Sequence, residues 1–106
     1  MPKYLFAASY SAQGVEGIHS KGGSSRIDAV GHMAEALGGK LESFYFALGD
    51  VDAYVIVELP DNEAAAACAL AVNSSGAVTV KTIQLLTPEE VDAAAKLSAE
   101  YRPPGG

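Results

Sequence analysis

The stretch "KLESFYFALGDVDAYVIVEL", Lys40 to Leu59, places two apolar segments on either side of a short acidic turn. The first segment alternates and is expected to form a strand with two distinct faces. These faces are Leu41, Ser43, Tyr45 and Ala47 against Glu42, Phe44, Phe46 and Leu48. The second segment, Ala53 to Leu59, is nearly all apolar and rich in β-branched residues, which is typical of a central strand. We therefore expect a hairpin of two consecutive strands.

Two acids, Asp50 and Asp52, lie in the turn between these strands. They are either a carboxylate pair placed for chemistry or ordinary turn residues. At a hydrated hairpin tip both carboxylates would keep ordinary acidity and serve poorly as a general acid near neutral pH. Aspartate and glycine are also favoured in turns. We favour the structural interpretation, in which Asp52 accepts backbone hydrogen bonds that shape the turn.

Helical patterns flank the hairpin on both sides. Upstream, Ser25 and Asp28 form a capping signature, and Gly38-Gly39 ends the predicted helix from Ser25 to Leu37. Its apolar residues repeat at helical spacing: Ile27, Val30, Ala34 and Leu37. Downstream, Asp61 can cap an alanine-rich helix that runs to about Val72 and ends at "NSSG".

The outermost segments complete the pattern. "KYLFAASYS", Lys3 to Ser11, predicts a first strand buried on both faces, and Ala77 to Leu86 predicts a fourth strand. The segment from Ala12 to Ser25 carries four glycines and is expected to be a loop, with one helical turn at most. Thr87-Pro88-Glu89-Glu90 starts a last helix at Pro88, and "YRPPGG" cannot continue a helix.

The resulting order, β-α-β-β-α-β with a C-terminal helix, predicts an α+β, ferredoxin-like fold. We expect one domain over residues 1–106, folded to about residue 98 with a tail at 99–106. Right-handed crossovers place both helices on one face of the sheet and leave the other bare. An apolar bare face seldom stays in water, so we expect a homodimer or higher oligomer that packs sheet to sheet. The space between the sheets is then the natural ligand pocket.

Composition limits the partners. Seven basic against thirteen acidic residues give a net charge of −6, and the basic residues do not cluster, which argues against nucleic acid. The longest apolar run, Ala64 to Val72, has nine residues, whereas a membrane-spanning helix needs about 20. Tyr4 to Ala8 is too short for the core of a signal peptide. From these short apolar runs we expect no membrane anchor. Cys68 is the single cysteine, which fits a reducing compartment, so we expect a cytoplasmic location.

Few residues suggest chemistry on their own. His19 and Arg26 lie near Lys21 at the start of the first helix, where they either hold an anion or carboxylate-bearing ligand or belong to a solvated, capped loop. The solvated loop is favoured. His32 is expected on the surface, and Cys68 is expected to be a small buried hydrophobe without a catalytic role. The chain lacks the ligand spacing of a zinc site, so no metal is expected, and no cofactor is identified.

Polar residues interrupt the apolar strands at several positions. Tyr45 shares a face with Ser43, and Tyr54, Glu58, Thr79 and Lys81 are similar interruptions of neighbouring strands. If they converge on the face away from the helices, they supply the polar groups of a mainly apolar pocket. Alternatively, Tyr45 and Tyr54 are interface packing with their hydroxyls at the rim. Both interpretations stay open.

Short motifs follow one another along nearly the whole chain: "QG" at Gln13 with Gly17-Ile18, Lys21 and Arg26, "GGK" at Gly38, Tyr45, "GDVD" at Gly49, "PDNEAAA" at Pro60 and "GAVTVKT" at Gly76. By their order and spacing the chain resembles the GYD domain family. Where the family carries its tyrosine, this chain has Val51, so only Gly49 and Asp52 match that stretch. The resemblance implies a dimeric α/β-barrel in which two ferredoxin-like units pack sheet to sheet. It implies no particular reaction, because related folds serve many functions.

Two hypotheses about function follow. In the first, the protein is a small cytoplasmic homo-oligomer that binds, and in its stronger form transforms, a small organic molecule between facing sheets. Candidate ligand contacts are Tyr45, Tyr54, His19, Arg26 and Lys81. In the second, the sheets pack tightly without a ligand, and the protein is a non-catalytic assembly or regulatory module. The second hypothesis is motivated by the lack of an evident acid–base or nucleophile–base pair.

Overall fold

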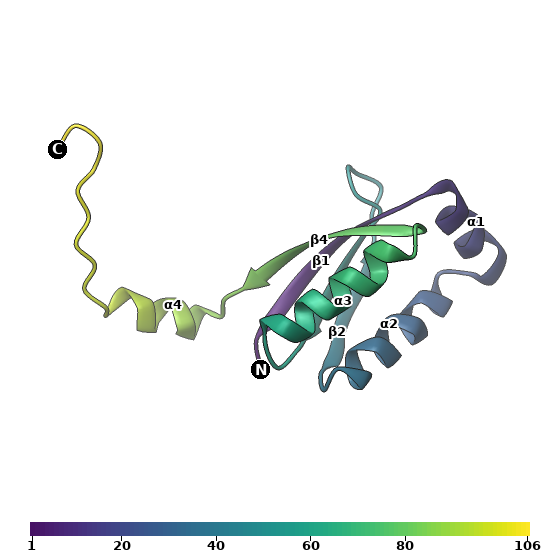
Figure 1. Ribbon diagram of the computed structural model, residues 1–106, viewed down its shortest axis with the longest axis horizontal. Helices are drawn as coiled ribbons and strands as arrows, with labels where there is room; N and C mark the ends of the chain where they lie inside the picture. The colour runs from purple at the N-terminus through teal and green to yellow at the C-terminus, as the bar shows by residue number, and fades with distance from the viewer.

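A computed structural model describes residues 1–106 as a four-stranded sheet with four helices (Figure 1). The elements are β1 (Lys3–Tyr10), α1 (Ala12–Lys21), α2 (Ser24–Ala36), β2 (Lys40–Phe46), β3 (Ala53–Glu58), α3 (Asn62–Ser74), β4 (Val78–Leu85) and α4 (Pro88–Ala95). The strand order is β2-β3-β1-β4, and every neighbouring pair is antiparallel. This arrangement confirms the α+β, ferredoxin-like prediction.

The two crossover helices, α2 and α3, lie side by side on the same face of the sheet (Figure 1), as the handedness rule requires. The main core lies between them and the central strands. It joins Tyr4 and Phe6 of β1 to Val57 of β3, with Ala34 from α2 and Cys68 from α3. None of the helices is long and apolar enough to cross a membrane.

Strand β1 is covered on one face only, which corrects the expectation that both faces are buried. Tyr4, Phe6 and Ala8 point toward the helices and are 2%, 5% and 3% exposed. The alternate residues Leu5 and Ala7 are half-buried and lie on the opposite face. Both parities of this strand are apolar, but the chain supplies helices for only one of them. We call the uncovered side the bare face.

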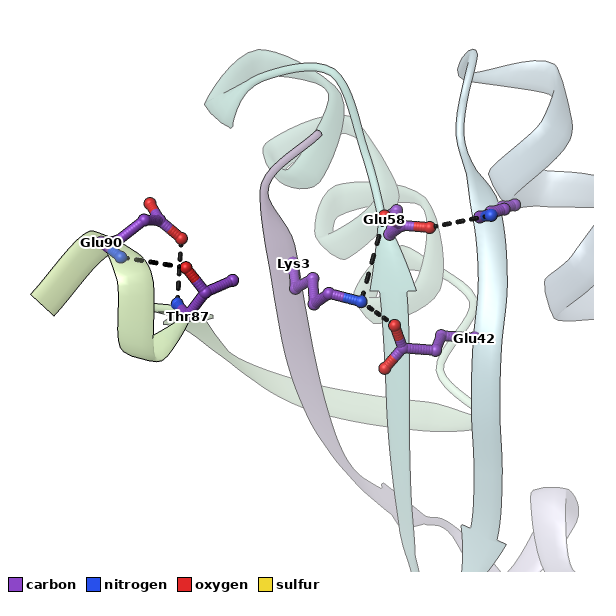
Figure 2. A network of polar contacts seen from close by, with 6 residues as sticks. Lys3, Glu42, Glu58, Thr87 and Glu90 are labelled. Carbon is purple, nitrogen blue, oxygen red and sulfur yellow. Dashed lines mark hydrogen bonds and ion pairs between the residues drawn. The ribbon is translucent and has the colours of Figure 1, made fainter. Parts of the chain in front are cut away.

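A β-bulge in β2 breaks the strict alternation predicted for that strand. The register with β3 shifts between Leu41 and Ser43, so Leu41 packs against the core together with Phe44 instead of sharing the face of Tyr45. Glu42 instead forms an ion pair with Lys3 of β1 (Figure 2). The extra residue of a bulge moves the side chains that precede it to the opposite face of the sheet. Alternation in the sequence alone cannot reveal this change.

Helix α1 occupies most of the segment predicted to be a loop. Ser11 caps it, since its Oγ accepts a hydrogen bond from the backbone N–H of Gly14 at 3.2 Å. A Cβ at Gly14 would lie 2.3 Å from the carbonyl oxygen of Ala77, so glycine is needed where α1 meets the start of β4. Each glycine costs a helix about 1 kcal/mol relative to alanine, and for this reason the pattern looked like a loop.

The starts of the other helices show which capping signals were read correctly. Helix α2 has Gly23 at its N-cap and no side-chain cap, so the predicted Ser25–Asp28 cap is wrong; Ser25 Oγ donates to the carbonyl of Gly22 at 2.7 Å. The Asp61 cap of α3 is confirmed, at 2.9 Å from the N–H of Ala64. The capping box of Thr87 and Glu90 at α4 is also confirmed, with hydrogen bonds of 3.1 and 2.9 Å (Figure 2).

The C-terminal arm, residues 86–106, extends away from the rest of the chain (Figure 1). It contains α4 and an irregular tail, and every residue of α4 is exposed. Its large apolar side chains are exposed as well: Leu86, Val91, Leu97 and Tyr101, at 62%, 51%, 76% and 77%. The arm therefore contributes nothing to the core of this copy.

Candidate functional site

Three of the five candidate residues lie in a single row across the bare face. Tyr45 of β2 is opposite Tyr54 of β3, Tyr54 is opposite Ala7 of β1, and Ala7 is opposite Lys81 of β4. Tyr45 is 72% exposed and Tyr54 is 43% exposed. Neighbouring strands are about 4.8 Å apart, so Lys81 and Tyr54 stand about 10 Å apart with the small Ala7 between them. The row therefore places two phenols on one side of the small Ala7 side chain and an ammonium group on the other.

The neighbouring row on the same face is mostly apolar. It runs from Ser43 through Ile56 and Leu5 to Ile83. Beside Lys81 the surface forms a hollow of about 430 Å³. It is lined on the bare face by Ala7, Ser9, Thr79 and Lys81, and it extends past Asp50 and Val51 of the turn to Val80 and to Asn73 of α3. The bare face thus offers an apolar floor with hydroxyl, ammonium and carboxylate groups along one side.

An ion network closes the other end of the bare face (Figure 2). Lys40 Nζ lies 3.2 Å from Glu58 Oε2, and Lys3 Nζ lies 4.0 Å from Glu58 Oε1. Lys3 also pairs with Glu42. The hydrogen bond from Lys40 is the main cause that holds the pKa of Glu58 below its ordinary value, against the opposing effect of desolvation. Glu58 is therefore a structural ion-pair partner across three strands.

The two other candidates, His19 and Arg26, lie on the opposite side of the sheet. His19 is exposed on α1, and Arg26 is half-buried in the first turn of α2. The five candidates therefore do not form one site. His32 is exposed on α2, which confirms its predicted surface position.

Arg26 lines a small, partly open pocket between the sheet and the helices, which we call the inner cavity. This inner cavity has a volume of about 30 Å³ and is lined by twelve residues, of which eleven are hydrophobic. An adjoining outer cleft of about 240 Å³ opens toward α1. Arg26, Tyr10 and Val78 line both spaces, so they lie at the boundary between them. The Nε of Arg26 is buried and has no hydrogen-bond partner.

The acidic turn has the structural role expected for it. Asp52 Oδ2 accepts a hydrogen bond from the backbone N–H of Tyr10 at 2.8 Å, and the Asp52 N–H donates to the carbonyl of Ala8 at 2.8 Å. These bonds tie the turn to β1, which confirms the interpretation of Asp52. Asp50 is exposed and lies at the hollow beside Lys81.

Cys68 is buried at 4% exposure and lines the inner cavity. Its Sγ lies 3.7 Å from the Sδ of Met33, and burial raises the pKa of the thiol. A neutral thiol is a poor nucleophile at neutral pH, in agreement with the prediction of a small buried hydrophobe. No group of three or more His, Cys, Asp or Glu side chains is placed to hold a metal ion.

Comparison with known proteins gives one match. The family model for the GYD domain covers residues 4–95, from β1 to the end of α4. Neither the curated proteins nor the solved structures contain a match. Since the matched region is most of the chain, this protein belongs to the GYD domain family.

Proposed function

We propose that this protein is a homo-oligomer that binds a small organic molecule between the bare faces of two copies. The observation that carries the proposal is the row of Tyr45, Tyr54 and Lys81 over an apolar floor. Ligand sites are typically apolar concave spaces with a few polar groups that fix orientation. A flat apolar or aromatic molecule with hydrogen-bond acceptors at one edge fits that pattern.

The second copy is part of the proposal because a single bare face is open to solvent. Packing a second sheet about 10 Å above the first would cover the part of the hollow that lies on the bare face beside Lys81. A cytoplasmic location is proposed with it, and the lone cysteine supports that location. The proposal concerns binding and includes no reaction step.

Thermal stability of variants tests the proposal. A panel of neutral aromatic compounds, phenols and amides, is screened against the intact protein, and a ligand at 100 times its Kd adds about 2.7 kcal/mol of stability. For a domain of this size that raises Tm by roughly 10 °C or more. We expect Tyr54→Phe or Lys81→Met to remove most of the rise for a compound that binds the bare face.

The matched control is Arg26→Met, which removes a cationic side chain on the other side of the sheet. It should leave the rise intact. A panel without any stabilising compound, or a rise that survives Tyr45→Phe, Tyr54→Phe and Lys81→Met alike, would contradict the proposal.

A dry assembly module is the second candidate, and the exposed C-terminal arm is the observation that favours it. The arm holds large apolar side chains that this copy leaves in water. An oligomer that forms fully, with no compound that stabilises it and no effect of Tyr54→Phe on its assembly, would support this alternative.

A further inference from the structure

We infer that the helix side of the sheet holds a separate site for a small carboxylate with a short apolar tail, bound by Arg26. The inference is independent of the function proposed for the bare face. It rests on the inner cavity, the outer cleft and the arginine between them, none of which that function uses.

The state of Arg26 is the first argument. Its guanidinium is always charged and carries five N–H donors. In this structure Nε is buried without an acceptor, next to a cavity whose other lining residues are hydrophobic. An unsatisfied buried donor destabilises a fold, whereas an anion beside Arg26 would satisfy it. A carboxylate matches the planar fork of arginine with two parallel hydrogen bonds.

Charge is the second argument. The chain has a net charge of −6, yet no acidic side chain lines either the inner cavity or the outer cleft. The cleft instead carries Lys21 beside Arg26, with Gln13 and Ser25 as neutral polar groups. A local excess of two positive charges in an acidic protein selects for an anion.

Size and polarity set the class of ligand. The inner cavity of about 30 Å³ has room for about two water-sized groups. Its hydrophobic lining favours carbon over water, so a tail of two or three carbons fits behind the guanidinium. Inorganic phosphate would satisfy Arg26 but would leave the cavity unfilled. The geometry therefore favours a short-chain carboxylic acid, with its tail in the inner cavity and its carboxylate at Arg26 facing the outer cleft.

The test titrates acetate, propionate, butyrate, hexanoate, propionamide and inorganic phosphate into ¹⁵N-labelled full-length protein. The readout is the Nε–Hε resonance of Arg26, and Tm is followed in parallel. We expect propionate or butyrate to bind at least 5-fold more tightly than acetate. Hexanoate should gain nothing over butyrate, and propionamide should leave the resonance unchanged. The assignment to a carboxylate would be overturned if phosphate bound tightly and the affinities of the carboxylates did not depend on tail length.

Variants assign the site to named residues. Arg26→Met should weaken propionate binding at least 10-fold, while Lys96→Met, which removes a positive charge from the exposed end of α4, should not change it. Arg26→Lys keeps the charge and should bind several-fold more weakly than the wild type. Val72→Leu fills part of the cavity and should abolish the preference for propionate over acetate.

Two further readouts keep the proposal testable if a variant folds poorly. Without ligand, Arg26→Met should melt at the same or a higher temperature, because it removes an unsatisfied donor. In the wild type, propionate should slow the reaction of Cys68 with methyl methanethiosulfonate, since that thiol lines the cavity. No change of the Arg26 resonance with any carboxylate at millimolar concentration, or equal binding by Arg26→Met, would overturn the inference.

Discussion

At the scale of single residues, Glu58 shows how an ion pair stabilises the bare face. Its side chain is 17% exposed and forms ion pairs with Lys40 of β2 and Lys3 of β1. The pKa of Glu58 is lowered in the folded protein, first by the hydrogen bond from Lys40. A lowered pKa means that the unfolded chain binds more protons, so the stabilisation is present above the unfolded pKa and is lost in acid.

We predict that Glu58→Gln lowers Tm at neutral pH and has little effect in acid. The ordinary pKa of glutamate is 4.5, so the contribution should be complete at about pH 6 and should fall as pH drops through 4.5 and the lower folded pKa. Differential scanning calorimetry from about pH 7 to pH 3 measures it. Glu100→Gln in the exposed tail is the control, and a Tm difference for Glu58→Gln that persists at pH 3 would contradict the prediction.

Arg26 illustrates what the sequence could and could not reveal at this scale. The predicted apolar stripe began at Ile27, which is 43% exposed, whereas Arg26 lines the inner cavity together with Val30 and Met33. These three residues follow the spacing i, i+4 and i+7, so the helical period did contain the signal. Arg26 is already a candidate anion contact from the sequence, but its place on this stripe is not recognised there, because a charged residue at the end of an apolar stripe is usually solvated. Only the packing shows that its Nε lacks a partner.

At the scale of elements, contacts within one copy of the chain do not explain why the C-terminal arm contains a helix. Helix α4 has eight residues, and isolated helices shorter than about 12 residues are marginal in water. Its capping box adds only about 1 kcal/mol. We expect the exposed apolar residues of the arm to pack against a second copy in the proposed oligomer.

We therefore predict that ending the chain after Thr87 weakens self-association at least 10-fold and leaves the sheet folded. Sedimentation equilibrium gives the association constant, and far-UV circular dichroism reports the fold. Val91→Ser with Leu97→Ser should reproduce part of the loss. Glu89→Gln with Asp92→Asn, at exposed positions of the same helix outside the capping pair, is the control for a change of charge in α4 that keeps its apolar side chains. An unchanged association constant after truncation would show that the arm has another role.

Two of the three predicted helix caps were confirmed, at Asp61 and Thr87, whereas helix α1 and the bulge in β2, which depend on distant contacts, were not predicted. The caps at Asp61 and Thr87 act within four residues, so they could be read from the sequence. Helix α1 contains two glycines. One of them, Gly14, is explained by its close approach to Ala77, which lies just before β4 and is distant in sequence. The bulge at Glu42 and Ser43 depends on pairing with β3. Nothing within β2 itself encodes it.

At the scale of the whole molecule, the isolated chain exposes more surface than a compact protein of its mass. Its accessible surface is 7218 Å², against about 5,600 Å² expected for a monomer of 10.9 kDa. Its radius of gyration is 16.8 Å, against about 13 Å for a compact chain of this length. The excess of about 1,600 Å² on one chain is about twice the roughly 800 Å² that each partner buries in a standard interface between proteins. The arm and the bare face are the parts that a second copy would cover.

We predict that Ile56→Glu dissociates the proposed oligomer. Ile56 lies in the row between Ser43 and Leu5 on the bare face, so its substitution would place an unpaired carboxylate between two sheets. An uncompensated charge buried at an interface typically costs about 3–5 kcal/mol. This cost corresponds to a decrease of more than 100-fold in the association constant. Light scattering coupled to size exclusion measures the mass of the species.

The matched control is Ala66→Glu, which adds the same charge on the exposed side of α3. It should leave the mass unchanged, and both variants should keep the circular dichroism of the wild type. If Ile56→Glu remains an oligomer, the sheets do not face each other, and the bare-face pocket fails with them. The Arg26 site would survive that result, because the inner cavity and the outer cleft are formed within one copy. A monomeric Ile56→Glu that still binds propionate would therefore separate the two sites.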